Sequence, residues 1–386
     1  MAYDSDLSFN YFGPTKVIFG AGSVSELPIE VSAFGKKAVL VTDEGLMATG
    51  LVEQVQEKLG ELMVYTYADV PADSGMEVVD QGAREALSAG ADVIVSLGGG
   101  SVIDTAKAMS IVMNEGGSIR DFQGLQMLTR PQIPHIAVPT TAGTGSEVTS
   151  AAVIFDQEQG QKILVFEYFI TPRVAILDPK ITASLPPQLT AATGMDAMTH
   201  AVESYVSLQR NPISDAAALH AIRLIVNYLP LAVSNGSDLS ARGQMQVAAL
   251  LAGWAFSNAM VGLAHAMAHS LGAVCRIPHG LANALILPQV MRYNQTEVPE
   301  LMMDIAAAMG ISIEELDTLA AGKAAADKME GFLKQIGLTE RLKDLGVKPE
   351  ALKQCAELSM SDGSIVYNPK MVMDADEILD IYMKLY

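Results

Sequence analysis

Hydrophobic residues in the first half of the chain form short, nearly continuous runs separated by amphipathic stretches. Runs rich in Val, Ile and Leu predict strands at 17–19, 38–42, 62–67, 93–97, 135–139, 151–155 and 174–177. Such runs are typical of strands that are buried on both faces. Between them, apolar residues recur at helical spacing, for example over 46–60 and 76–90. The alternation of strand and helix predicts a parallel α/β sheet.

The second half of the chain has a different pattern. The β-type runs fade after about residue 186, and Ala, Leu and Met recur at helical spacing, as over 214–229 and 351–360. The segment 177–189 between the two patterns contains Asp178-Pro179 and Pro186-Pro187, which interrupt regular structure. We therefore predict an α/β domain over residues 1–185 and an all-helical domain over residues 186–386.

Composition narrows the class of protein. With 50% hydrophobic and 18% charged residues in 386, the chain can bury a large core, which excludes a disordered protein. The net charge of −19 without an extended Lys/Arg cluster predicts that the protein binds neither nucleic acid nor anionic membranes. The chain has only two cysteines and no leader-like N-terminus, which predicts a cytoplasmic protein. It has no apolar run long enough to predict a membrane span. The high mean hydropathy of +0.27 indicates a buried homo-oligomer interface or a large core.

A glycine-rich loop follows the predicted strand 93–97. Gly98, Gly99, Gly100 and Ser101 open the stretch GGGSVIDTAK, in which a helix begins. Glycines allow backbone amides to approach an anion closely, and the positive end of a helix attracts phosphate. The alternative is a tight strand-to-helix turn with no ligand, and the glycines alone do not decide between the two.

Two further features favour a dinucleotide. The loop PTTAGTGSEVT, at 139–149, follows another predicted strand and offers the hydroxyls of Thr140 and Thr141. Asp43 ends the strand 38–42, where a carboxylate binds a ribose 2′-hydroxyl and repels a 2′-phosphate. This position favours NAD over NADP. The alternative for Asp43 is a helix N-cap.

Histidines and one aspartate form a metal-ligand pattern. Asp196 and His200 are four residues apart, as are His265 and His269, and His279 follows closely. Side chains at this spacing lie on one helical face and can meet one ion. Imidazole suits Fe, Zn, Co or Ni, and three histidines with one carboxylate leave a coordination position for substrate. A lone histidine is more often a core residue, which is the interpretation for His135 and His220.

Together these motifs resemble the iron-dependent (group III) alcohol dehydrogenase family. The similarity extends from residues 10–27 to the C-terminal DGSIVYNPK at 362–370, with GMDAMTHAVE and AHAMAHSLGAVCRIPHGLANA between them. The resemblance implies a dehydroquinate synthase-like fold, in which a dinucleotide-binding α/β domain and an all-helical metal-binding domain enclose a cleft.

The resemblance also implies roles for individual residues. The metal ligands would be Asp196, His200, His265 and His279. The dinucleotide contacts would be Asp43, Gly98, Gly99, Gly100, Ser101, Thr140, Thr141 and Lys162. Phe256 would line the substrate pocket, and His269 would lie near the nicotinamide, as a proton relay or as a structural brace. The turn PADS at 71–74 lacks an Asn that is usual in the family, and Ala151 replaces an Asn found in some members.

The predicted activity is metal-dependent hydride transfer between NAD(H) and a small primary alcohol or diol and its aldehyde. Fe²⁺ is the expected metal and Zn²⁺ the alternative, and a homodimer or larger homo-oligomer is expected. One alternative function is an NAD- and metal-dependent lyase of the dehydroquinate synthase type. The scarcity of basic residues near the helical motifs, apart from Arg276, disfavours its anionic substrate. The other alternative is a non-catalytic metal-binding scaffold, which the intact ligand set disfavours.

Overall fold

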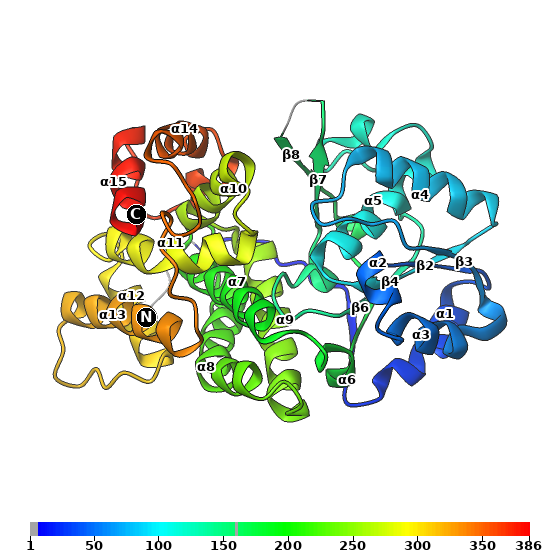
Figure 1. Ribbon diagram of the computed structural model, residues 1–386, viewed down its shortest axis with the longest axis horizontal. Helices are drawn as coiled ribbons and strands as arrows, with labels where there is room; N and C mark the ends of the chain where they lie inside the picture. The colour runs from blue at the N-terminus through cyan, green and yellow to red at the C-terminus, as the bar shows by residue number, and fades with distance from the viewer. Residues whose placement is uncertain (1–6, 159–160) are drawn as a thin grey trace.

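The protein consists of an α/β part and a helical part that lie side by side (Figure 1). The computed structural model describes residues 7–158 and 161–386. The first part contains the strands, and the second contains the bundle that runs from α7 to α15. The predicted fold class is therefore confirmed. The predicted boundary at 185/186 lies between α6 (Pro179–Thr182) and α7 (Pro187–Val206), and it stays a prediction.

The α/β part is built on a six-stranded parallel sheet with the strand order β1-β9-β6-β4-β2-β3. Its strands are β1 (Lys16–Phe19), β2 (Ala38–Val41), β3 (Met63–Tyr67), β4 (Val93–Gly98), β6 (His135–Pro139) and β9 (Val174–Leu177). In the central pair, Gly98 of β4 lies opposite Pro139 of β6. The loops that follow these two strands therefore leave the same edge of the sheet side by side.

Helices cover both faces of this sheet. α1 (Leu27–Phe34) and α3 (Leu51–Leu59) pack on one face, and α4 (Met76–Ser88) and α5 (Gly100–Glu115) pack on the other. Alternate residues of β2 point to opposite faces of the sheet: Leu40 packs against α1 and α3, and Val41 packs against α4 and α5. The helix predicted over 46–60 is divided into α2 (Glu44–Met47) and α3, because Gly50 adopts a φ of 77°.

The strand predicted at 151–155 does not join the parallel sheet. It is β7 (Ala151–Asp156), which pairs antiparallel with β8 (Gln161–Phe166), and β8 pairs with the short β5 (Gly124–Leu125). The sequence analysis missed both β5 and β8. In Figure 1 this second sheet extends from the α/β part toward α10.

The helical part is formed by α7, α8 (Pro212–Ser234), α9 (Leu239–Ala259), α10 (Leu263–Cys275), α11 (His279–Asn294), α12 (Pro299–Ala308), α13 (Thr318–Gln335), α14 (Pro349–Ser359) and α15 (Ala375–Leu385). These helices share one large apolar core. By length and composition α8 could cross a membrane, with 44% of its apolar window buried. Here α8 packs against both α7 and α9 and leaves Arg223 exposed, as expected for a helix at the edge of a bundle.

Candidate active site

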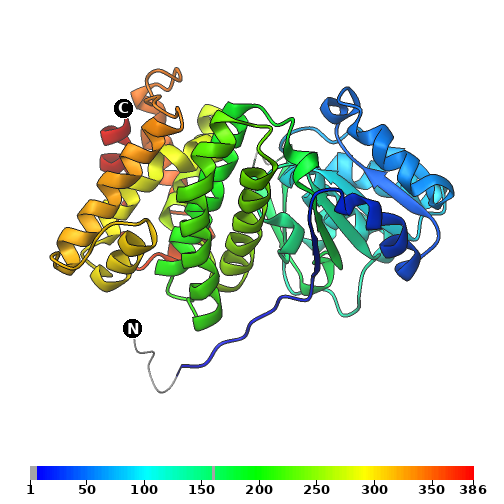
Figure 2. The ribbon, with the colours of Figure 1, turned by 90° about the horizontal axis from the view of Figure 1, so that it is seen from below.

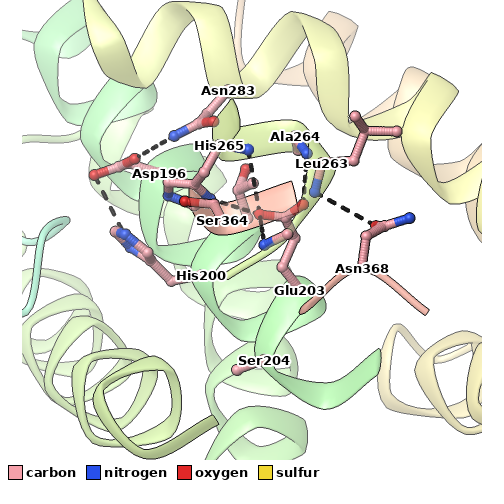
Figure 3. Close-up of polar contacts among 12 residues, drawn as sticks. Asp196, His200, Glu203, Ser204, Leu263, Ala264, His265, Asn283, Ser364 and Asn368 are labelled. Atoms are coloured by element: carbon pink, nitrogen blue, oxygen red, sulfur yellow. Dashed lines mark hydrogen bonds and ion pairs between the residues drawn. The ribbon is translucent and has the colours of Figure 1, made fainter. Parts of the chain in front are cut away.

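Side chains from three helices converge where the bundle faces the α/β part. Asp196 lies on α7, His265 on α10 and His279 at the first position of α11. Each offers a ligand atom, and these atoms lie within 4.8 Å of one another. His279 Nε2 is 3.4 Å from Asp196 Oδ1. Asn283 Nδ2, one turn along α11 from His279, donates to the same aspartate oxygen at 2.8 Å (Figure 3).

The orientation of His265 is set by a buried glutamate. Glu203 Oε2 lies 2.6 Å from His265 Nδ1, and the Glu203 carboxylate also accepts hydrogen bonds from the backbone N–H groups of Gly262, Ala264 and His265. A proton held on Nδ1 by this carboxylate leaves the lone pair on Nε2. Nε2 is buried and has no hydrogen-bond partner within the described part of the chain. The imidazole therefore presents a free electron pair toward Asp196 and His279.

The charges in this cluster are those of a metal-ligand set. Burial alone would raise the pKa of Asp196, but the imidazoles of His200, His279 and His265 lower it to about 2. Burial lowers the pKa of His200 to about 4 and that of His279 well below its usual range. Burial also acts to lower the pKa of His265, yet the hydrogen bond and charge of Glu203 raise it overall. At neutral pH the aspartate is ionised, and His200 and His279 are neutral.

His200 lies beside the group of three. Its Nδ1 is 4.0 Å from Asp196 Oδ2 and has no hydrogen-bond partner among the described residues. The imidazole of His200 stacks on His265, with ring centroids 4.5 Å apart, and its other neighbour is Phe256 of α9 at 4.2 Å. Phe256 is half-buried, so its ring forms a wall of the site next to the histidines.

His269 lies one turn beyond His265 on α10 but outside the group of three. Its Nδ1 is 2.7 Å from Asp362 Oδ2, and its ring stacks on that of His279 with centroids 5.3 Å apart. Burial would raise the pKa of Asp362, but the hydrogen bond to His269 lowers it well below its usual range. The other Asp362 oxygen accepts from the N–H of Ser364. This carboxylate fixes the imidazole at the edge of the cluster, where the His269 side chain is 31% exposed.

The predicted phosphate loop lies at the N-terminus of α5. Gly99 is its N-cap residue and provides no side chain to cap the first-turn N–H groups. The second predicted loop lies against the first, because Thr140 N donates to Gly98 O and a Cβ on Gly99 would lie 3.3 Å from Thr141 Cγ2. The structure thus brings the two loops together, and within the described residues no side chain caps the amide donors at the start of α5.

Asp43 and Lys162 flank these loops. Asp43 is the N-cap of α2 and accepts from Leu46 N at 3.0 Å. The helix-capping role that was the alternative interpretation of Asp43 is therefore observed. Lys162 Nζ lies 2.6 Å from Asp73 Oδ1, and Asp73 N donates to Ser101 Oγ. The positive charge of Lys162 also acts to lower the pKa of His279. Lys162 is linked to the phosphate loop through Asp73.

Family models match nearly the whole chain. The model for iron-containing alcohol dehydrogenases covers residues 14–179, and the model for the C-terminal part of the Fe-containing alcohol dehydrogenase family covers residues 190–386. The chain belongs to the iron-containing alcohol dehydrogenase family. The resemblance that the sequence motifs indicated is confirmed, and the protein is an oxidoreductase by family.

Individual relatives of this iron-containing alcohol dehydrogenase are similar over their full length. An NAD-dependent methanol dehydrogenase of Bacillus methanolicus is 39% identical over 96% of this chain and 98% of its own. A 1,3-propanediol dehydrogenase of Klebsiella pneumoniae is 42% identical over 94% of this chain and 95% of its own. A crystal structure of 1,3-propanediol oxidoreductase superposes with a TM-score of 0.96 at 40% identity, covering 98% of this chain and all (100%) of the other.

The donor set of this family member fits an iron ion. His265 Nε2 and His200 Nδ1 have no hydrogen-bond partner among residues 7–158 and 161–386. Both are buried beside an ionised carboxylate, an arrangement that a divalent cation stabilises. Asp196, His265 and His279 would hold the metal. When bound, iron supplies the positive charge that lowers the pKa of a substrate hydroxyl.

Sequence reasoning missed residues that support the site. Glu203 lies seven residues after Asp196, on the same face of α7, and this helical spacing could have identified it. Asp362 lies within the motif DGSIVYNPK, which carried no assigned role. The interpretation of His135 as a core residue is correct, since its Nε2 lies 2.7 Å from Ser96 Oγ. His220 is exposed on the outer face of α8, so the same interpretation is wrong for it.

Proposed function

We propose that the protein catalyses the reversible NAD(H)-dependent oxidation of small primary alcohols or diols to aldehydes at an iron ion. The observation that carries the proposal is that the loop 139–149, which carries Thr140 and Thr141, packs against α7 close to Asp196, since a Cβ on Gly143 would lie 2.8 Å from Thr193 Cβ. The names of the relatives support it, since they specify NAD, methanol and 1,3-propanediol. His200, whose ring borders the group, is proposed as the fourth protein ligand.

On the cofactor side, the N–H groups at the start of α5 bind the pyrophosphate, with Gly98, Gly99, Gly100 and Ser101 allowing close approach. This surface is extended by the hydroxyls of Thr140 and Thr141, which lie beside Gly98 and Gly99, and by the ammonium of Lys162, which is joined to Ser101 through Asp73. The carboxylate of Asp43, after β2, accepts from the adenosine ribose. These groups orient the dinucleotide so that its nicotinamide end lies toward the histidine cluster.

On the substrate side, Phe256 limits the space next to His200, which favours a small alcohol. His269 is the proposed proton relay, because Asp362 holds its Nδ1 and leaves its other nitrogen available at the partly exposed edge of the cluster. A relay and a brace for the cofactor pocket predict different kinetics for a variant that lacks the imidazole.

The assembly and location are also part of the proposal. The extended N-terminal segment before β1 projects from the body (Figure 2), and it exposes Leu7 and Phe9. Two hydrogen bonds between Phe12 and Asn258 attach this segment to the helical part. Exposed apolar side chains on an anchored segment support a homodimer or larger homo-oligomer, and the protein is proposed to act in the cytoplasm. Light scattering on the eluted protein measures the oligomer.

The decisive experiment is an NADH-consumption assay with short aldehydes. The protein is stripped with a chelator and then reloaded with Fe²⁺ or Zn²⁺. We expect aldehyde-dependent NADH oxidation with Fe²⁺ and the reverse reaction with 1,3-propanediol and NAD⁺. Metal-dependent turnover of a phosphorylated anionic substrate, with no reaction of any alcohol or aldehyde, would instead favour a lyase. NADH and metal binding without any turnover would favour a scaffold.

A further inference from the structure

A lysine in the glycine-loop motif lies in the protein interior. Lys107, on α5 in the stretch GGGSVIDTAK, has 0% exposure. A fully enclosed ammonium cannot reach a ligand in the cleft. Its Nζ donates to Ser146 Oγ at 2.8 Å, to Thr149 Oγ1 at 2.9 Å and to Ala151 O at 2.8 Å. All three ammonium protons are thereby used within the protein.

Asp104, one turn before Lys107, holds the same segment. Its Oδ1 accepts from Ser146 Oγ and lies 3.6 Å from Lys107 Nζ, while its Oδ2 accepts from Val153 N at 3.0 Å. One turn of α5, through Asp104 and Lys107, therefore forms hydrogen bonds with several residues between 146 and 153. This stretch ends the loop that carries Thr140 and Thr141, which we name the threonine loop (residues 139–149).

The threonine loop itself is enclosed by close contacts. A Cβ on Gly145, whose φ is +61°, would lie 2.6 Å from Gly253 Cα of α9. A Cβ on Gly100 would lie 2.7 Å from Thr144 Cγ2, so this loop also contacts the start of α5. The loop touches the helical part on one side and the phosphate loop on the other. A small shift of residues 146–149 would therefore be transmitted to both neighbours.

We propose that Lys107 is a positioning residue, which holds the threonine loop in the conformation that binds the dinucleotide, without contacting the dinucleotide. The inference rests on the proposed function, because it assigns Thr140 and Thr141 to the cofactor surface. Without the ammonium, two hydroxyls and one carbonyl lose their common donor, and Asp104 loses its counter-charge. Of these polar contacts with α5, the loop then keeps only the hydrogen bond from Ser146 Oγ to Asp104.

The test compares Lys107→Met with Lys58→Met, a matched change at an exposed lysine of α3. Lys107→Met keeps most of the aliphatic stem and removes the donor. We expect its Kd for NADH, measured by fluorescence titration, to rise about tenfold, since small displacements of binding groups carry costs of this order or more. Without NADH, amide hydrogen exchange should accelerate within the threonine loop. Iron content per chain should equal that of the wild type, and Lys58→Met should match the wild type throughout.

Several outcomes would overturn the inference. If Lys107→Met had the NADH affinity and the loop exchange of the wild type, Lys107 would not position the loop for the dinucleotide and would contribute only to the stability of the fold. Loss of iron together with NADH binding would indicate general damage. In the double variant Asp104→Asn with Lys107→Met, the charge that Asp104 would carry without its partner is removed, so we expect the melting temperature to recover in part while NADH affinity stays low. Recovery of both would show that the unpaired charge, not the position of the loop, caused the defect.

If Lys107→Met does not fold, Thr149→Val removes a single acceptor of the ammonium in a side chain of the same shape. A smaller rise in Kd with faster exchange of the loop supports the inference, and unchanged values of both overturn it. Failure of the proposed function is distinct, since it would appear as a wild-type protein that does not bind NADH at all.

Discussion

The two sides of the cleft form their parts of the site by different means. The helical part uses side chains: Asp196, His265 and His279 come from three helices and present ligand atoms to one point. The α/β part uses mainly backbone: the N–H groups at the start of α5 are uncapped, and a Cβ at Gly98 would lie 2.4 Å from Val102 Cβ. The helical side should therefore be most sensitive to the loss of a side chain, and the α/β side to a change in loop conformation.

The two sides also differ in how their charge is arranged. The buried carboxylates of Asp196 and Glu203 and the partly exposed carboxylate of Asp362 lie beside the histidines, which is suited to a cation. The facing surface has the positive end of α5 and the ammonium of Lys162, which are suited to phosphates. These two positive groups lie where an anionic cofactor would bind, in a chain whose net charge is −19. The following variants test whether metal binding and cofactor binding are separable.

The largest effect is expected from His265→Ala, because it removes a buried ligand whose orientation is fixed by Glu203. We expect iron content to fall below detection and turnover to fall at least about 1000-fold, while the Kd for NADH stays close to that of the wild type. Metal analysis and fluorescence titration measure the two. His220→Ala, at an exposed position on α8, is the control. His200→Ala tests the proposed fourth ligand, and full iron occupancy in that variant would remove His200 from the set.

His269→Ala is expected to keep its iron, since His269 lies outside the group of three. If His269 relays a proton, kcat should fall about 100-fold, the KM for NADH should change little and the pH dependence of kcat should lose one ionisation. Asp362→Asn, which weakens the hydrogen bond to Nδ1, should show a smaller change of the same kind. An increase in the KM for NADH with an unchanged pH profile would instead identify His269 as a brace, and loss of iron would make it a ligand.

Local patterns in the sequence predicted the parts of the site that lie within one element. The i, i+4 spacing of Asp196 and His200 fixes a shared helical face, and the run before Gly98 fixes a buried strand. The pairing of His269 with Asp362 could not be predicted, because 93 residues separate them and only the packing of α10 against the C-terminal helices joins them. Lys107 lies within the glycine-loop motif, but the sequence did not reveal that its side chain is buried in the interior. Likewise β8 was missed, since its pairing with β7 depends on a hairpin rather than on a buried run.

Glu203→Gln should weaken metal binding without abolishing it. The amide cannot stabilise the Nδ1 proton of His265 as a carboxylate does, and loss of such outer partners lowers metal affinity about 10- to 100-fold. The pKa of His265 is raised by Glu203, so in the wild type protons compete with iron for Nε2 as the pH falls through that raised pKa. In Glu203→Gln this pKa falls, and proton competition should begin at a lower pH. Iron titrations at several pH values measure both effects, and equal affinity at neutral pH would contradict the role of Glu203.

The smallest effect is expected from Asp43→Gly, which tests whether this carboxylate selects NAD. If Asp43 accepts from the ribose 2′-hydroxyl, its removal abolishes repulsion of a 2′-phosphate, and the ratio of kcat/KM for NADPH to that for NADH should rise about tenfold. Asp43 also caps α2, but Gly is a good N-cap residue, so the loss of the cap should cost only a few tenths of a kcal/mol.

Asp317→Gly is the matched control for the cap, because Asp317 is the N-cap of α13 in the helical part and accepts from Ala320 N. It should lose a cap in the same way without changing the cofactor ratio. Iron content should equal that of the wild type in both variants. Asp43→Gly would then change cofactor use without changing metal binding, whereas His265→Ala changes metal binding without changing NADH affinity. Equal use of NADPH and NADH by the wild type would show that Asp43 acts only as a helix cap.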